Sequence, residues 1–335
     1  MKIKSPGFRI GASYATAFSM DGEHLGVVGP RGVALWSVAS RRRLRTLRLL
    51  RHPAAVAFAP DGQTFVVKNT LGELLLAETA TVDPIARFAP PTQDEGANPV
   101  FAAPDLIIDG SWSGEIRARD TTRLMPRVLW RGKSRMVGQV MRAGDVWAFE
   151  VTAIHSHPEF ESAAGADQVL VADAPDGARL RAVERTWRFL RGAALSPDGR
   201  LLSVRYGAER RIVEVLDVST GRVVAFAGSD FGGTGWAHGW APDGKVLVLV
   251  ERRGFSFRDT SDLREIGWLP SEYPAHVSFS AERGLIALGD WSTGVVAPWP
   301  ELLTEITARQ PAGASASMTE RIVTADEGAP AVDTE

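Results

Sequence analysis

Short apolar runs separated by turn residues recur along most of the chain. Around positions 196–199 one run, Gly-Ala-Ala-Leu-Ser, precedes the turn, and three runs, Leu-Leu-Ser-Val-Arg-Tyr, Arg-Ile-Val-Glu-Val-Leu-Asp and Arg-Val-Val-Ala-Phe-Ala, follow it. These runs are rich in β-branched residues and partly alternate between apolar and polar positions, a pattern typical of strands rather than helices. The pattern predicts four short strands in each unit of this kind.

The turn itself repeats, because Ser-Pro-Asp-Gly at 196–199 has close copies at 59–62 and 241–244. Pro presets φ, Asp bonds to its own backbone and Gly accepts positive φ. The acids of the seven related turns are Asp21, Asp61, Asp105, Asp145, Asp198, Asp243 and Glu282. Their intervals are 40, 44, 40, 53, 45 and 39 residues, and periods near forty predict propellers or solenoids.

A second sequence marker divides the chain into the same repeat units. An acid closes the third strand in five units, at Glu78, Asp120, Asp173, Asp217 and Asp259. Because four short strands per unit make a propeller blade, we predict an all-β fold, a seven-bladed β-propeller of four-stranded antiparallel blades. The longest interval places an insertion at about 155–166, between the second and third strands of the fourth blade.

The seventh unit lacks an outer strand. The chain there reaches Pro300 and a segment, 300–309, predicted as a short helix with Pro at its first position. Residues 3–10 precede the first blade, and we predict that they supply the missing strand and close the ring. The propeller then covers 1–299. Residues 310–335 have neither periodicity nor much apolar content, and we predict that they are disordered.

These features resemble the WD40-type β-propellers, including bacterial variants whose blades carry a Ser-Pro-Asp-Gly turn. The resemblance covers roughly residues 8–299. Leu35-Trp36-Ser37 stands where the family has its Trp-Asp pair, and Val-Leu-Asp-Val-Ser-Thr-Gly-Arg at 215–222 is typical of its junction between third and fourth strands. No unit combines a Gly-His before the first strand with a Trp-Asp, so the buried hydrogen-bond tetrad of the family is not reproduced.

Composition narrows the function classes. The 335 residues contain no Cys, which excludes disulfides, thiolate zinc sites and cysteine nucleophiles. No apolar run is long enough to span a bilayer and we find no signal peptide, so we expect a cytoplasmic protein without a membrane partner. The net charge of −2 argues against nucleic-acid binding. The preference for Arg over Lys and the abundant Ala indicate a GC-rich bacterial source.

The insertion offers one candidate metal site. His155 and His157 would share a face of a continuing strand, and three acids follow at Glu159, Glu161 and Asp167. The other interpretation is an exposed polar hairpin, which we favour because a loop rarely holds three ligands without outside support. We therefore predict no metal and no cofactor.

Two other segments allow a ligand-binding interpretation. The glycine-rich 228–235 could cradle phosphate, but it leads into a strand and has no Lys, which favours a connector. The arginine run at 41–51 could contact phosphate or an acidic partner, although its alternation with Leu44 and Leu47 favours the solvated edge of an outer strand. Common catalytic motifs are absent, and the isolated His52, His238 and His276 fit structural roles better than catalytic ones.

Blade topology contributes the strongest functional prediction. The connections from second to third strand, and from a fourth strand to the next blade, emerge on one face and collect aromatics beside arginines, the composition of an interaction hot spot. We predict partner binding there by Arg31, His52, Trp112, Arg135, Phe160, Tyr206, Arg210, Phe231, Arg252, Tyr273 and Trp291. Any single aromatic could instead plug the channel mouth or pack under a loop.

We hypothesise a non-enzymatic, WD40-like scaffold subunit that binds other protein subunits in a larger bacterial assembly. The alternative is an enzyme, or a propeller that binds a small ligand or metal, at the channel mouth near His155 and His157.

Overall fold

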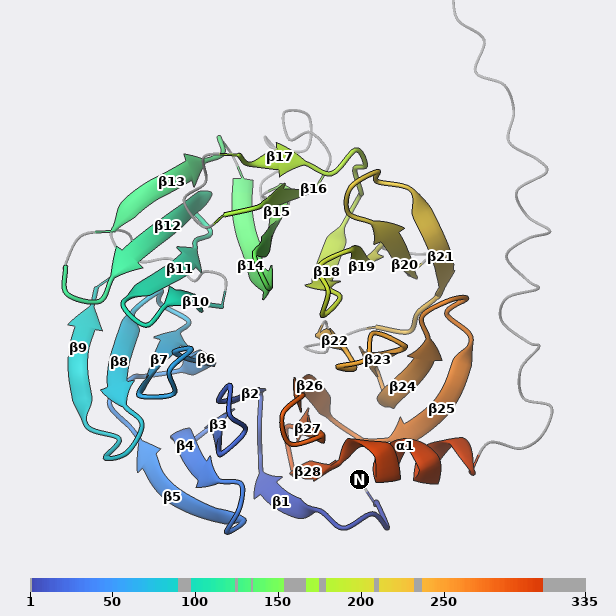
Figure 1. Ribbon diagram of the computed structural model, residues 1–335, viewed down its shortest axis with the longest axis horizontal. Coiled ribbons are helices and arrows are strands. Elements are labelled where there is room, and N and C mark those ends of the chain that lie inside the picture. Colours follow the sequence, from blue (N-terminus) through green and yellow to red (C-terminus); the bar gives the residue numbers. More distant parts are fainter. Residues whose placement is uncertain are drawn as a thin grey trace, which may run out of the picture.

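The computed structural model describes residues 2–89, 98–123, 126–133, 135–153, 167–174, 179–207, 211–231 and 237–309. Within these ranges the chain forms seven four-stranded antiparallel sheets arranged as a ring around a central channel (Figure 1). The predicted seven-bladed β-propeller is therefore confirmed. The first strand of each blade lines the channel, and the fourth lies at the rim.

The blades are numbered in chain order, with strands given from the channel outward. Blade 1 contains β2 (Ala15–Phe18), β3 (His24–Gly29), β4 (Gly32–Ser37) and β5 (Arg42–Leu47). Blade 2 contains β6 (Pro53–Phe58), β7 (Thr64–Asn69), β8 (Leu74–Glu78) and β9 (Pro84–Phe88). Blade 3 contains β10 (Val100–Ala103), β11 (Leu106–Gly110), β12 (Glu115–Asp120) and β13 (Arg127–Arg131). Blade 4 contains β14 (Arg135–Ala143), β15 (Val146–Ala153), β16 (Gln168–Ala172) and β17 (Arg181–Ala182).

Blade 5 contains β18 (Leu190–Leu195), β19 (Leu201–Tyr206), β20 (Ile212–Asp217) and β21 (Val223–Gly228). Blade 6 contains β22 (His238–Trp240), β23 (Val246–Glu251), β24 (Gly254–Asp259) and β25 (Glu265–Pro270). Blade 7 contains β26 (Pro274–Ser280), β27 (Leu285–Asp290), β28 (Gly294–Pro298) and, as its outer strand, β1 (Phe8–Gly11). The helix α1 (Trp299–Thr307) follows β28.

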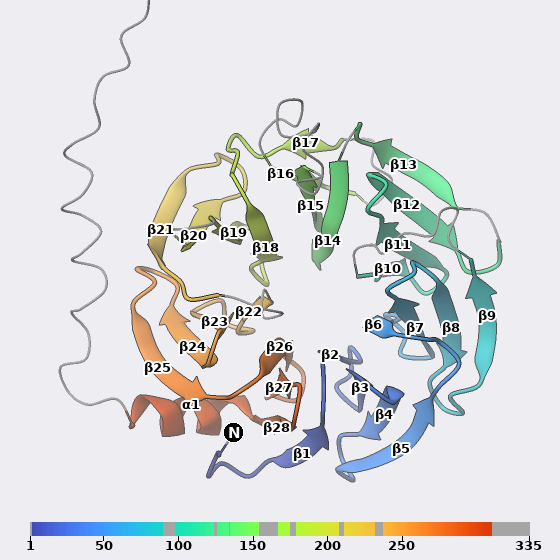
Figure 2. The same cartoon turned by 180° about the vertical axis from the view of Figure 1, so that it is seen from behind.

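The ring closes through the N-terminal strand, as predicted. β1 pairs antiparallel with β28, placing Phe8 opposite Val296. A second contact lies beside it, because the Glu305 carboxylate of α1 accepts hydrogen bonds from the backbone N–H groups of Lys4 (2.7 Å) and Ser5 (2.6 Å). Figure 2 shows α1 along the rim beside β25, with the N-terminus next to β1. The two ends of the described chain thus hold one another in place.

The apolar core lies between neighbouring blades, because each blade is a single sheet that can bury its faces only against the next. One cluster joins Val28 and Leu35 of blade 1 to Phe65 and Leu75 of blade 2. The second strands contribute most, and all six residues of β23 are buried. Removing an apolar side chain from such a layer typically costs about 2–5 kcal/mol.

The recurrent turn joins the first and second strands of a blade and satisfies its own polar groups. In blade 5 the Asp198 carboxylate accepts hydrogen bonds from the Ser196 hydroxyl (2.6 Å) and the Arg200 N–H (3.1 Å). Gly199 has φ +70°, where a side chain would be strained. The equivalent acid of blade 1, Asp21, makes the same pair of bonds with Ser19 and Glu23. In these two blades the chain therefore reverses direction through hydrogen bonds formed within the turn itself.

Several sequence predictions concern regions with little or no structural description. The insertion at 155–166 and the segment 310–335 lie outside the described residues. The arginine run, in contrast, is described, and its residues Arg42–Leu47 form β5, the outer strand of blade 1, as predicted. The alternation with leucine is not kept, because Leu44 is exposed like its arginine neighbours and only Leu47 is buried. Among the described residues, no helix is long and apolar enough to cross a bilayer.

Candidate interaction face

The ring has two faces of different character. We call the repeat face the side bearing the Asp-Gly turns between first and second strands. The variable face is the opposite side, formed by connections from second to third strands and from each fourth strand to the next blade. The strand order places the following predicted residues on the variable face: Arg31, His52, Trp112, Arg135, Tyr206, Phe231, Arg252, Tyr273 and Trp291. Phe160 and Arg210 lie outside the described residues.

Three aromatic side chains of the predicted set are open to solvent on this face. Trp112 is 42% exposed, Tyr273 52% and Trp291 41%. Trp112 lies in the connection between β11 and β12 of blade 3. Tyr273 precedes β26 and Trp291 lies between β27 and β28 of blade 7, and the backbone N–H of Trp291 donates to the Tyr273 carbonyl oxygen at 2.9 Å. Exposed aromatic surface of this kind is common at the centres of interfaces.

Two other predicted aromatic side chains are buried or half-buried instead. Phe231 is buried, at 4% exposure, with the guanidinium groups of Arg205 and Arg211 over its ring at 4.8 and 5.5 Å. Tyr206 is half-buried, and its hydroxyl donates to the Glu214 carboxylate at 3.2 Å. Phe231 in particular packs below the loops and presents no free surface.

Tyr14 joins the exposed pair, although the sequence did not single it out. Its ring lies against Trp291, with centroids 3.9 Å apart. Tyr14 follows the closing strand β1, so its neighbour comes from the far end of the propeller sequence. The sequence could have indicated Tyr14, because it lies in a connection from a fourth strand to the next first strand, like the predicted residues. We call Tyr14, Tyr273 and Trp291 the aromatic ridge.

The variable face also carries cations that lack partners. Within the described part of the chain, six exposed basic side chains on this face form no ion pair: Arg31, Arg48, Arg51, Lys133, Arg188 and Arg253. Several acids of the same face are already engaged, since Glu73 pairs with Arg87, and Asp230 lies 3.6 Å from Arg211 and 3.8 Å from Arg252. Among the described residues of this face, the unpaired basic side chains therefore outnumber the unpaired exposed acids, such as Glu272.

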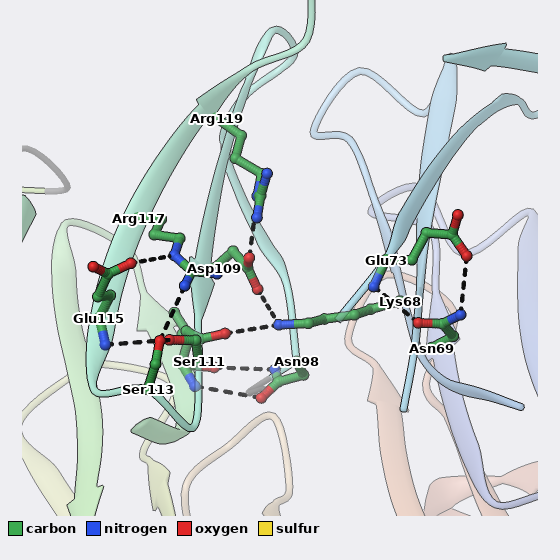
Figure 3. A network of polar contacts seen from close by, with 12 residues as sticks. Lys68, Asn69, Glu73, Asn98, Asp109, Ser111, Ser113, Glu115, Arg117 and Arg119 are labelled. Carbon is green, nitrogen blue, oxygen red and sulfur yellow. Dashed lines mark hydrogen bonds and ion pairs between the residues drawn. The ribbon is translucent and has the colours of Figure 1, made fainter. Parts of the chain in front are cut away.

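Beneath the variable face, charged groups are buried between blades 2 and 3. Figure 3 shows Lys68 of β7 reaching across to Asp109 of β11, to which it donates, and it also donates to the Gly110 carbonyl at 2.7 Å. Arg119 donates to the same carboxylate at 3.1 Å. Burial lowers the pKa of Lys68, while Asp109 opposes that shift. The pair links two second strands that share no backbone hydrogen bonds.

A similar buried pair joins blades 5 and 6. Arg205 of β19 donates to Glu251 of β23 at 3.0 Å and to the Val250 carbonyl at 2.7 Å. Burial lowers the pKa of Arg205 to about 10 and raises that of Glu251, and the charge of each group opposes the shift of the other.

Glu150 of β15 is the contrasting case. Only 6% of it is exposed, and within the described residues its Oε2 atom has no hydrogen-bond partner. Burial, with repulsion from Asp167, raises its pKa to about 7, while Arg191 opposes the shift. Gly138 lies where a Cβ would come within 2.6 Å of Oε1, so the glycine makes room for the carboxylate.

The central channel forms a cavity of about 810 Å³, lined largely by residues of the first strands, among which alanine is the commonest. Its polar groups include Thr16, Gln139 and His276. His276 Nδ1 lies 3.3 Å from both the N–H and the hydroxyl of Thr16, and burial lowers the pKa of His276 to about 4. The imidazole is therefore neutral near pH 7 and acts in hydrogen bonding, as expected for a structural histidine.

The described residues contain no cluster of three or more His, Cys, Asp or Glu side chains suited to a metal ion. Asp167, one member of the predicted metal set, accepts hydrogen bonds from the N–H groups of Ala153 and Leu190, both at 2.8 Å. His155, His157, Glu159 and Glu161 lie outside the described residues.

Comparisons with known proteins address the fold. No protein-family model matches the sequence, and no curated protein matches it. Among solved structures, the β-propeller domain of Cps50 (Swd1) from Myceliophteria thermophila is similar, with a TM-score of 0.68 and 12% identity. The match covers 88% of this chain and 99% of that one. At this identity the likeness establishes a shared β-propeller fold.

Proposed function

We propose that this protein is a non-catalytic interaction platform, a WD40-like scaffold subunit that binds other protein subunits of a bacterial assembly through its variable face. One observation carries the proposal. The same face combines exposed aromatic side chains, at Trp112, Tyr273 and Trp291, with basic side chains that have no ion pair in the described chain. Interface cores are enriched in aromatics and arginine, and unpaired charges steer association.

The opposite face supports the assignment by contrast. Its recurrent turns bind their own acids, as Asp198 and Asp21 show, so those carboxylates are already hydrogen-bonded. The sequence resemblance to WD40-type propellers implies the same class of function, and the shared propeller fold is compatible with it. A rigid ring also keeps its connections fixed relative to one another, which lowers the entropic cost of binding.

Affinity capture from the native host tests this proposal. The intact protein would be compared with a triple variant, Trp112→Ala, Tyr273→Ala and Trp291→Ala, and captured proteins identified by mass spectrometry. We expect a stoichiometric partner whose recovery falls about tenfold or more in the variant, since aromatic hot-spot residues each contribute about 2 kcal/mol or more. A further variant lacking 155–166 tests whether the insertion contributes.

A matched control removes exposed apolar side chains elsewhere. Met20 lies on the repeat face, whereas Ile85 and Phe226 lie on outer strands, and they are 70%, 56% and 52% exposed. Replacing these three with Ala should leave capture unchanged. Equal losses in both triple variants, or no stoichiometric partner for the intact protein, would contradict the platform.

The alternative function is an enzyme or small-ligand propeller at the channel mouth near His155 and His157. The channel volume of about 810 Å³ is large enough for a small molecule. Metal analysis of the protein purified from its host distinguishes the two proposals. Stoichiometric metal that disappears in the His155→Ala/His157→Ala variant, with no partner captured, would favour the alternative.

A further inference from the structure

The aromatic ridge is an exposed apolar surface at the junction of blades 6, 7 and 1. Tyr273 and Trp291 are 52% and 41% exposed, and the Tyr14 ring supports Trp291 from the side. The backbone N–H of Trp291 donates to the Tyr273 carbonyl oxygen, so the connections that carry these rings are fixed relative to one another. Exposed rings held in this way form a preorganised surface for a small apolar segment.

Cations flank the ridge on both sides. On the blade 6 side, Arg252 and Arg253 form the turn between β23 and β24. On the blade 1 side, Arg31 lies in the turn between β3 and β4. Arg31 and Arg253 are exposed and form no ion pair with described residues, while one exposed acid, Glu272, lies beside Tyr273. A segment that fits this surface would therefore carry acids on both sides of an apolar centre.

The chain contains such a segment near its C-terminal end. Residues 326–335 read Asp-Glu-Gly-Ala-Pro-Ala-Val-Asp-Thr-Glu, with two acids before Ala-Pro-Ala-Val and two more after it. Its proline restricts the backbone to extended conformations, which lowers the entropic cost of laying the segment against exposed aromatic rings. We propose that residues 326–335 dock on the aromatic ridge of the same molecule, with their two acidic ends facing the flanking arginines.

The chain is long enough for this contact. Ile306 of α1 lies against Gly267 of β25, and Gly267 precedes Tyr273 by six residues, about 20 Å at ~3.3 Å per residue. The described chain ends at Arg309. The sixteen residues 310–325 can reach about 50 Å when fully extended. Even with about 5 Å added for the helical residues from Ile306 to Arg309, docking stays within the available length.

The consequence concerns regulation of the interaction face. Where the variable face binds a partner, as proposed above, the docked segment competes for the ridge and lowers partner affinity. This regulatory role rests on the proposed function, whereas the docking itself does not. Because a tethered segment acts at a high effective concentration, weak intrinsic binding is sufficient for substantial occupancy.

Contact quenching of a dye tests the docking in the full chain. The chain has no cysteine, so Ala331→Cys provides a single attachment point for an oxazine dye, which Trp quenches on contact. We expect Trp291→Ala to raise the emission about twofold or more, the change for a segment docked at least half the time. Neutralising the segment with Asp326→Asn, Glu327→Gln, Asp333→Asn and Glu335→Gln should do the same.

Trp112→Ala is the matched control, because Trp112 is exposed to the same extent on the same face but lies in blade 3. It should leave the emission unchanged. A charge variant, Arg31→Gln/Arg253→Gln, keeps the rings and should also raise the emission. Salt at about 1 M, where the Debye length is ~3 Å, should raise it in the parent protein. Circular dichroism confirms that each variant is folded.

Three outcomes would overturn the proposal: emission that is insensitive to Trp291→Ala, an equal rise in Trp112→Ala, or quenching that grows with protein concentration, which would indicate docking on a second copy. Partner capture separates this failure from failure of the proposed function. If capture depends on Trp291 while quenching does not, the platform stands without the docked segment. If quenching depends on Trp291 while capture does not, the docking stands without the platform.

Discussion

The two faces of the ring satisfy their polar groups in different ways. On the repeat face, Asp198 is bonded by Ser196 and Arg200 within one turn, and Asp217 is bonded by the hydroxyls of Ser219 and Thr220. Beneath the variable face, Lys68 finds Asp109 only in the next blade. Local bonding needs the same few residues at every turn, whereas bonding across blades needs a different partner at each junction.

This difference separates structural residues from candidate functional ones. A turn whose hydrogen bonds are complete within five residues can be copied from blade to blade, and it leaves a visible sequence repeat. A contact between blades leaves no repeat, and the exposed residues above it are free to vary. Binding specificity is therefore expected on the variable face, where Trp112, Tyr273 and Trp291 are exposed.

Breaking a buried pair under the variable face should have the largest effect on stability. Lys68→Met removes the Nζ donor from Asp109 and leaves that carboxylate, which is fully buried, with Arg119 alone. We expect the free energy of unfolding to fall by about 3–5 kcal/mol, as for other buried pairs that lose one partner. Urea denaturation measures this.

A double-mutant cycle with Asp109→Asn serves as the control for the Lys68 prediction. The double variant should lose less than the sum of the two single losses, because the two groups interact directly. A loss below about 1 kcal/mol for Lys68→Met would show that the pair is no more important than a surface contact.

The same contrast explains what the sequence could and could not predict. The seven related turns, four of them Asp-Gly, predicted the number of blades, and the apolar runs around Asp198 correspond closely to β18, β19, β20 and β21. Ring closure was also predictable, because the seventh unit lacked a strand and residues before the first unit could supply it. Each of these features is encoded within one unit or in the count of units.

Contacts between units were not predictable from one sequence. Tyr14 stacks on Trp291, 277 positions away, and nothing local to either residue indicates the other. Phe231 looked like an exposed aromatic, yet Arg205 and Arg211 cover it from different elements. The sequence shows the charged residues of the second strands, but which of them pair depends on how adjacent blades align. The strand order predicted which connections lie on each face, but not how far their side chains are exposed.

Glu150 provides the next test, because it is a buried carboxylate under the variable face with an unpartnered oxygen. Burial raises its pKa from 4.5 to about 7 in the folded state. The unfolded chain thus loses this proton at lower pH, and stability falls as pH rises from about 4.5 to 7. Glu150→Gln mimics the protonated form, so it should add up to about 3 kcal/mol at pH 8 and almost nothing at pH 4.5.

Thermal unfolding across this pH range measures the Glu150 effect. Asp167 and Arg191 are the charged groups that influence it, and both stay in place in the variant. The exposed Glu301 on α1 is the matched control, and Glu301→Gln should change stability equally at both ends of the range. A constant difference between Glu150→Gln and the parent protein at all pH values would contradict the buried, unpaired carboxylate.

A repeat-face turn should contribute less to the free energy of unfolding, because its hydrogen bonds are few and partly exposed. Asp198→Ala removes the acceptor for Ser196 and Arg200, and we expect a loss of about 1 kcal/mol, near the net contribution of a typical hydrogen bond. Asp198→Asn keeps a side-chain oxygen and should retain most of the stability. Guanidinium denaturation of the three proteins compares them. A loss as large as that of Lys68→Met would remove the distinction between the faces.

The smallest effect is expected for a contact between blades that is exposed. Arg283 of blade 7 pairs with Glu23 of blade 1 on the repeat face, and the two side chains are 44% and 42% exposed. Arg283→Gln should cost no more than about 0.5 kcal/mol, and less in high salt, because water screens the pair. The Lys68–Asp109 pair also joins adjacent blades, but it is buried from solvent. If Arg283→Gln costs as much as Lys68→Met, bridging two blades is what stabilises the ring. If it costs little, burial of the charge decides, and substitutions of the buried charges between blades destabilise the ring most.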